Sequence, residues 1–184
     1  MHASRLRLIG HAARTFLLST LCLLCASQAR AGTFTLRSMA FDGGTKIPTG
    51  YTCDGANQSP PLSWEDVPAG TKSLVLIVDD PDAPAGAWLH WSVYDLPADV
   101  HELPRNVPVT DVLDRGAKQG RNDFGNPGYG GPCPPPGKPH RYLFKLYALS
   151  KPTSLHAGAK KAEVQHVVEH NVLGKAQLMG TYGR

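Results

Sequence analysis

The sequence predicts a mostly β domain with one late helix. Short segments rich in β-branched and aromatic residues recur between turns rich in Pro and Gly. One later segment, residues 159–171, has apolar residues at helical spacing. The sequence has no internal repeat and no heptad pattern. These observations favour one layered domain in which a late helix packs on a sheet.

The first 31 residues have the pattern of a secretory signal peptide. A basic start precedes the apolar run 16–26, and the small residues Ala29 and Ala31 follow it. The run is too short for a membrane-spanning helix, which needs about 20 apolar residues. We therefore expect cleavage near Ala31, which leaves residues 32–184 as a secreted or periplasmic domain.

The basic character of the whole chain comes from this leader. The formal net charge is +4, but four of the 19 basic residues lie in residues 1–31, so 15 basic residues balance 15 acidic ones in the rest. A balanced domain gives no electrostatic reason to expect a nucleic-acid partner. Its 153 residues fit a single domain with an ordinary hydrophobic core.

Two cysteines, Cys53 and Cys133, lie beyond the leader. An even number of cysteines in an oxidising compartment favours one disulfide, and two buried free thiols are the alternative. A bridge that closes a loop of about 80 residues stabilises a fold by about 4 kcal/mol, because it restricts the unfolded chain.

Six segments are expected to form strands, because they alternate or are rich in β-branched or aromatic residues. They are residues 33–38 (TFTLRS), 61–64 (PLSW), 73–79 (SLVLIVD), 89–96 (LHWSVYDL), 140–150 (HRYLFKLYALS) and 175–183 (KAQLMGTYG). The third is apolar along its length, as expected of a strand buried on both faces. The first is a candidate edge strand, which leaves a homodimer open.

A helix is expected over residues 159–171, ended by Asn171 or Gly174. Its apolar side is formed by Ala162, Val164, Val167 and Val168. Residues 120–139 form a long Gly/Pro-rich loop before the fifth strand. Loops of this length are uncommon in compact domains and are often functional.

Polar side chains lie where the expected strands begin and end. Asp80 follows the buried run, His90 lies between Trp88 and Trp91, and His140 opens the strand after the long loop. A solvated turn is the structural alternative for Asp80, and a hydrogen-bonded core residue is the alternative for His90. If the three converge at one end of the sheet, they form the kind of small polar pocket that binds ligands.

Strand alternation also predicts which way the residues around His90 point. His90 and Ser92 should share one face of the sheet. Leu89, Trp91 and Val93 should share the other.

In this order and spacing, the motifs LVLIVDDPDAP, WLHW and GYGGPCPPPGKPHRYLFKLYAL resemble the phosphatidylethanolamine-binding protein family, especially its bacterial Raf kinase inhibitor-like branch. The resemblance extends from about residue 34 to residue 184 and includes YTCDGANQSPPLSW at 51–64. It implies an antiparallel β-sandwich with a large and a small sheet and one or two peripheral helices. It also implies a small pocket for an anionic group, such as the phosphate of a phospholipid head group, that works without metal or cofactor.

The resemblance further implies which residues bind the ligand. The positions that match the family's motifs are Asp80, Pro84, His90, Gly131, Cys133, Pro135, His140 and Tyr142. A cis peptide bond is expected before Pro84, and Asp82 is expected to order the turn. An anion would accept hydrogen bonds from both imidazoles and from backbone N–H groups of the Gly-rich loop. Asp80 would fix the tautomer of a histidine.

We expect a binding protein for phosphate, phosphorylethanolamine or a similar head group, and not an enzyme. No G-x-S-x-G or Walker motif is present, and Ser92 is too close to His90 along one strand to be activated by it. Two histidines and an aspartate are also the ingredients of an iron or zinc site. A third alternative is that the pocket rim contacts a protein, for example an extracytoplasmic protease that the chain inhibits.

Overall fold

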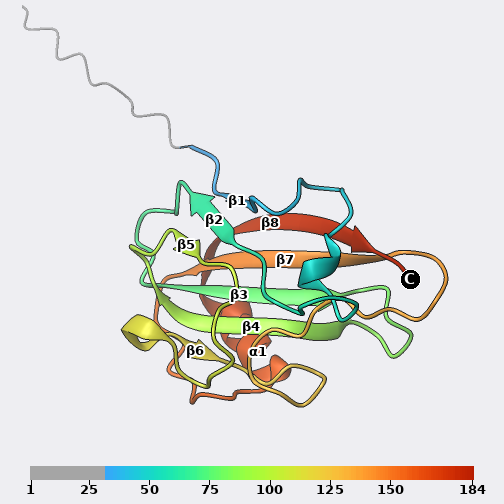
Figure 1. The fold of residues 1–184 in the computed structure, drawn as a ribbon. Helices are drawn as coiled ribbons and strands as arrows, with labels where there is room; N and C mark the ends of the chain where they lie inside the picture. Colours follow the sequence, from blue (N-terminus) through green and yellow to red (C-terminus); the bar gives the residue numbers. More distant parts are fainter. Residues whose placement is uncertain (1–31) are drawn as a thin grey trace, which may run out of the picture. The chain divides into compact units, whose positions relative to one another are not determined.

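The computed structural model describes residues 32–184, which form two antiparallel sheets and one α-helix (Figure 1). In spatial order, the larger sheet consists of β6 (Lys118–Gln119), β4 (Trp88–Pro97), β3 (Ser73–Asp80), β7 (His140–Leu149) and β8 (Val172–Tyr182). The smaller sheet consists of β1 (Thr35–Arg37), β2 (Leu62–Glu65) and β5 (Glu102–Leu103). The expected signal peptide lies outside the described residues.

The six expected strands and the helix are confirmed, with ends that differ by a few residues. The helix α1 (Lys161–Asn171) ends at Asn171, one of the two expected positions. Two-residue strands β5 and β6 were not predicted, because so short a segment has no periodicity to recognise. Two short 3₁₀ turns, Thr49–Tyr51 and Asp114–Gly116, were missed for the same reason. In residues 32–184 no helix is long and apolar enough to cross a membrane.

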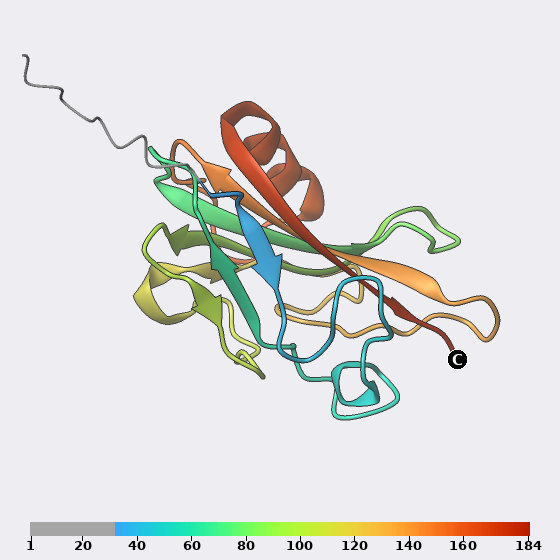
Figure 2. The ribbon, with the colours of Figure 1, turned by 90° about the horizontal axis from the view of Figure 1, so that it is seen from above.

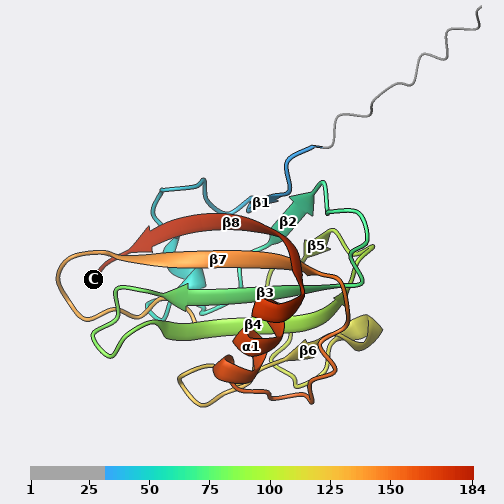
Figure 3. The same ribbon diagram turned by 180° about the vertical axis from the view of Figure 1, so that it is seen from behind.

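The central strand β3 is buried along its whole length, as its composition predicts. Leu74, Leu76 and Val78 belong to the core between the two sheets. Val75 and Ile77 point to the opposite face and pack in a second cluster with the buried residues of α1. The molecule therefore has three layers, with the large sheet between the small sheet and the helix (Figures 2 and 3).

The helix contacts the sheet through a narrower stripe than expected. Val164 and Val168 are buried, and Val167 packs beside them as a partly buried residue. Ala162 was expected on the same side but is exposed in the first turn of the helix. Its small side chain adds little apolar surface, so its exposure costs little.

A β-bulge in β4 changes which of its side chains share a face of the sheet, compared with simple alternation. Val78 pairs with Trp91 and Asp79 pairs with Leu89, so His90 is an extra residue without a partner in β3. Leu89 consequently lies in the cluster beside α1, whereas Trp91 lies in the core between the sheets. The expectation that Leu89 shares a face with Trp91 and Val93 was wrong, since simple alternation does not anticipate an inserted residue.

Candidate functional site

A cavity of about 240 Å³ lies where β3 ends and its two neighbours, β4 and β7, begin. It is lined by Asp80, Ala83, Pro84, Ala85, Trp88, His90, Phe124, Cys133, Pro134, Pro135 and His140. Antiparallel pairing explains this meeting, because the end of one strand lies beside the starts of its neighbours. Six of the eight residues expected from the sequence line the cavity. The other two, Gly131 and Tyr142, do not.

Asp80 and His140 form a hydrogen-bonded pair on one wall. The Nδ1 atom of His140 lies 2.8 Å from Oδ2 of Asp80. The second carboxylate oxygen, Oδ1, accepts the backbone N–H of Asp82 at 2.8 Å. Because both oxygens of this buried carboxylate are engaged, Asp80 acts as the residue that orients His140. The nitrogen of His140 left for a ligand is Nε2.

His90 is held differently, by the backbone of the long loop. Its Nδ1 lies 2.6 Å from the carbonyl oxygen of Gly130, and the side chain is only 2% exposed. Burial lowers the pKa of the His90 imidazole from its ordinary value, against a smaller opposing effect from the nearby Asp80 carboxylate. The neutral ring donates Nδ1–H to Gly130, so its free Nε2 is an acceptor. The expectation that His90 donates to an anion requires the protonated ring, whereas the neutral ring accepts at Nε2.

Two aromatic rings fix the plane of the His90 imidazole. The rings of Tyr142 and Phe124 meet it edge-on, with centroid distances of 5.1 Å and 5.4 Å. Tyr142 is fully buried, and its hydroxyl makes no hydrogen bond of normal geometry within residues 32–184, although the Asp80 carboxylate and the backbone of Cys133 lie close to it. Burial and the negative charge of Asp80 raise the pKa of the Tyr142 hydroxyl. Tyr142 thus supports the wall of the cavity from behind instead of lining it.

The opposite wall is the loop of residues 120–139, which follows the part of the β4 edge that does not pair with β6. Asp123 exchanges two hydrogen bonds with Leu89: its backbone N–H donates to the Leu89 carbonyl at 2.9 Å, and its carboxylate accepts the Leu89 N–H at 2.6 Å. Further along, the Gly130 N–H donates to the His90 carbonyl at 2.9 Å. These bonds satisfy backbone groups of β4 that would otherwise be exposed at its edge.

The buried side chain of Asn122 shapes the turn within this loop. Its Oδ1 accepts the backbone N–H groups of Phe124 at 3.0 Å and Asn126 at 3.2 Å, and its Nδ2 donates to the Gly128 carbonyl at 3.0 Å. The turn presents the Phe124 ring to Trp88, with centroids 5.5 Å apart. Sequence reasoning did not assign Phe124 to the cavity. The turn-forming run NDFGNPG around it was the available signal.

Gly131 has a structural role that differs from the one expected. Its N–H donates to Oδ1 of Asn57 at 2.8 Å. A Cβ at this position would lie 2.5 Å from the Tyr51 carbonyl oxygen, so only glycine allows this close approach. The Gly130 N–H is also engaged, and the four prolines between Gly131 and Gly137 have no N–H. The N–H groups of Gly130 and Gly131 are therefore not available to a ligand as the backbone donors that were expected.

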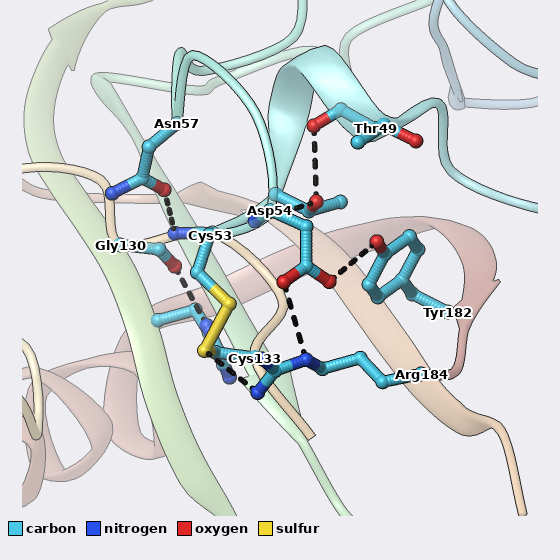
Figure 4. The surroundings of a disulfide bond; sticks show 11 residues. Thr49, Cys53, Asp54, Asn57, Gly130, Cys133, Tyr182 and Arg184 are labelled. Carbon is cyan, nitrogen blue, oxygen red and sulfur yellow. Dashed lines mark hydrogen bonds and ion pairs between the residues drawn. A yellow bond between two sulfur atoms is a disulfide. The ribbon is translucent and has the colours of Figure 1, made fainter. Parts of the chain in front are cut away.

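The expected disulfide between Cys53 and Cys133 is present and joins positions 80 residues apart (Figure 4). It fastens the loop wall to the segment that carries Asn57. Beside it, the Asp54 carboxylate accepts the Tyr182 hydroxyl at 2.7 Å and pairs with Arg184 at 3.2 Å (Figure 4). The disulfide and the contacts of Asp54 together therefore join three parts of the chain at the edge of the cavity.

The turn after β3 corrects one expectation and confirms another. No peptide bond in residues 32–184 is cis, so the expected cis bond before Pro84 is absent. The Gly86 N–H closes the turn on the Ala83 carbonyl at 3.0 Å, which makes Pro84 its second residue, where a trans proline fits. Asp82 orders the turn as expected. Its carboxylate binds the Arg141 guanidinium at 2.9 Å and 2.7 Å, which lowers the pKa of Asp82.

The geometry gives no support to the metal alternative. In the described part of the chain, no three His, Cys, Asp or Glu side chains are grouped to hold a metal ion. In the cavity, both Asp80 oxygens already accept hydrogen bonds, so this carboxylate is not free to bind an ion. The remaining groups suit a ligand that can both give and take a hydrogen bond.

Comparison with known proteins identifies the family of the chain. The family described as phosphatidylethanolamine-binding protein matches residues 37–183. The chain belongs to this family. A UPF0098 protein of Methanothermobacter thermautotrophicus is 51% identical over 149 residues, covering 81% of this chain and 98% of that one. The UPF0098 protein YbcL of Escherichia coli is 39% identical over 179 residues, covering 92% and 98%.

Solved structures of family members agree with the fold. The crystal structure of E. coli YbcL, described as a new member of the mammalian PEBP family, matches with a TM-score of 0.79 and 39% identity, covering 83% of this chain and 99% of that chain. A putative PEBP homologue, CT736 from Chlamydia trachomatis, matches with a TM-score of 0.74 and 41% identity, covering 83% and 98%.

Proposed function

We propose that this member of the phosphatidylethanolamine-binding protein family is an exported binding protein, and that its cavity takes a phosphoryl group that keeps one proton. The observation that carries the proposal is the convergence of Asp80, His90 and His140. Asp80 and His140 are 60 positions apart in the sequence, yet they pair at 2.8 Å on the wall of the cavity that His90 also lines. Inorganic phosphate and phosphorylethanolamine both carry such a group.

The two histidines offer complementary bonds to this group. In its protonated form, His140 donates Nε2–H to a phosphoryl oxygen, with Asp80 as the countercharge on the other side of the ring. His90, neutral because its pKa is lowered by burial, accepts the P–OH proton at Nε2. A group with one acceptor oxygen and one hydroxyl satisfies both rings.

The size of the cavity limits the ligand. Its volume of about 240 Å³ is below the range of about 300–1,000 Å³ that is usual for drug-sized ligands. We therefore infer that a phosphate or a small head group enters, and that any longer chain attached to it stays outside.

Export and binding without chemistry are parts of the same proposal. The leader pattern of residues 1–31 supports export, and so does the Cys53–Cys133 disulfide, since such bonds persist in oxidising compartments. The buried hydroxyl of Ser92 has no hydrogen-bond partner in the described residues. A nucleophile must lie within hydrogen-bond reach of its base, so Ser92 and His90 do not form a catalytic pair.

Calorimetry with inorganic phosphate and phosphorylethanolamine tests the proposal. Each charge-assisted contact contributes about 1.5–3 kcal/mol, so His90→Ala/His140→Ala should lower the affinity for either ligand more than about tenfold. The matched control is His101→Ala/His156→Ala, which removes two exposed histidines that do not line the cavity. Unchanged affinity in the cavity variant, or ligand density elsewhere in soaked crystals, would reject the proposal.

The dependence of binding on pH and ester type tests the role of His90. A phosphomonoester loses its last proton near pH 6. Because burial lowers the pKa of His90, the ring stays neutral and does not supply the proton of the hydrogen bond that the P–OH group has lost. Affinity should therefore fall as the pH rises from about 6 to 8. Dimethyl phosphate, a diester, carries neither an O–H nor an N–H donor. If dimethyl phosphate binds as tightly as phosphorylethanolamine at pH 6, His90 is not an acceptor.

A protein partner at the rim is the second candidate. Residues 135–139 are exposed, and they are held in place by the Cys133 disulfide and by a hydrogen bond from the Gly137 N–H to the Arg184 carbonyl at 3.2 Å. A preorganised exposed loop loses little entropy when it binds a partner. Assays against a panel of secreted proteases test this candidate. Inhibition that survives His90→Ala would favour rim contact over cavity binding.

A further inference from the structure

A second pair of histidines lies far from the cavity lining, on the helix α1. His166 and His170 are both exposed, and their ring centroids are 4.5 Å apart. Residues four apart lie one above the other on the same face of a helix. Each histidine follows a buried valine, Val164 or Val168, by two positions, which corresponds to about 200° around the helix axis. The pair therefore faces away from the sheet.

One hydrogen bond prepares His170 to bind through a single nitrogen. Its Nδ1 lies 2.7 Å from the carbonyl oxygen of His166, so the neutral ring donates Nδ1–H and keeps the lone pair of Nε2 free. Metal-bound histidines almost always make such a second bond, often to a backbone carbonyl, because it fixes the tautomer and the ring orientation. The helix backbone itself supplies this partner here.

We propose that His166 and His170 form a two-ligand site for a divalent transition metal ion of the kind that imidazole suits, such as Ni²⁺, Cu²⁺ or Zn²⁺. Two histidines at this spacing chelate metal from one helix face, as in the H-E-x-x-H arrangement. Glu163 is the nearest acidic residue before the pair, but its carboxylate accepts the Lys160 N–H at 2.8 Å at the start of the helix. Water completes the coordination, which makes the bound ion exchangeable.

Chromatography of the untagged chain on immobilised Ni²⁺ tests the site, with an imidazole gradient for elution. The wild-type chain should be retained, and His166→Ala/His170→Ala should lose retention. Gln165→His/His166→Ala keeps the number of histidines but places the two rings about 140° apart around the helix, so it should also lose retention. The control His101→Ala/His156→Ala removes two exposed single histidines and should elute with the wild type.

Calorimetry with NiCl₂ alone provides the second measurement. One ion should bind per wild-type chain, and this binding should be absent in His166→Ala/His170→Ala, whose melting temperature should match the wild type because both substituted side chains are exposed. Equal retention of the spacing variant and the wild type would overturn the proposal. So would loss of Ni²⁺ binding in His90→Ala/His140→Ala, which would place the ion in the cavity.

Discussion

The two walls of the cavity are held in place by different kinds of interaction. The strand wall carries Asp80, His90 and His140 at the ends of strands whose backbones are fixed by sheet hydrogen bonds. The loop wall, residues 120–139, is held by the Cys53–Cys133 disulfide and by bonds from side chains to backbone groups. The strand wall carries the polar side chains of the cavity, and the loop wall encloses them.

This difference predicts which wall of the cavity is destabilised more by single substitutions. Sheet bonds are numerous, so the strand wall does not depend on any single side chain. The loop wall depends on a few contacts with a distant segment: Asn57 lies 74 positions from Gly131, and Tyr51 lies 78 positions from Tyr129. We expect single changes to destabilise the loop wall more than the strand wall. The following experiments are ordered from the largest expected effect to the smallest.

Removal of the disulfide should have the largest effect. Cys53→Ser/Cys133→Ser should lower the free energy of unfolding by about 4 kcal/mol, because the unfolded chain regains the entropy of a closed loop of 80 residues. Urea unfolding measures this change. Hydrogen exchange should accelerate in residues 120–139 and stay slow in β3 and β7. Equal acceleration in both walls would contradict the distinction between them.

Gly131→Ala should destabilise the loop wall by about 1–3 kcal/mol, because the added methyl group clashes with the Tyr51 carbonyl and the Asn57 side chain. Gly50→Ala is the matched control. A Cβ at Gly50 meets nothing within 4 Å, so its effect should stay within about 0.5 kcal/mol. Thermal unfolding of the two variants measures the difference, and similar melting temperatures would show that Gly131 is not packed as described.

Two buried tyrosines, one from each wall, should respond with opposite signs. Tyr129 donates its hydroxyl to the Tyr51 carbonyl at 2.7 Å, so Tyr129→Phe should cost about 1 kcal/mol or more. The hydroxyl of Tyr142 makes no hydrogen bond of normal geometry in the described residues, so Tyr142→Phe should be neutral or stabilising by up to about 1 kcal/mol. Urea unfolding of both variants tests this. A clear loss of stability in Tyr142→Phe would mean that its hydroxyl is hydrogen-bonded in solution.

The ion pair between Asp82 and Arg141 should have the smallest effect. Because Arg141 is mostly exposed, Asp82→Ala should lower stability by less than about 1 kcal/mol at pH 7. The pKa of Asp82 is lowered in the folded state, so its contribution is present above the unfolded pKa of about 4 and is lost as the pH falls below it. Melting temperatures of wild type and variant should therefore converge at acid pH. A gap that widens at low pH would reverse the assignment.

Parts of the site that depend on strand order could be predicted from the sequence. The apolar run of β3 identified a buried central strand. The polar residues that adjoin it and the neighbouring strands in the sequence were therefore expected at the ends of the sheet. Asp80 and His140 meet because antiparallel neighbours bring those ends together. The predicted disulfide was also correct, because two cysteines allow only one pairing.

Other parts could not be predicted because they arise from distant contacts. The bulge at His90 depends on how β4 fits β3 and the loop, and local alternation has no sign of it. The hydrogen bond from the Gly131 N–H to the Asn57 side chain could not be predicted either, because both residue types are common in loops. For this reason the sequence placed both histidines beside one cavity but did not show which backbone group binds Nδ1 of His90.

The order and composition of the segments were enough to predict a mostly β fold with one late helix, because strands and helices have different local periodicity. The ordered motifs were enough to indicate the family, and the resemblance implied the two sheets and the side chains at one sheet end. Tertiary structure decided which nitrogen of each histidine stays free and which loop groups are already bonded. Those properties depend on burial and on single hydrogen bonds between residues far apart in the chain, which no local pattern encodes.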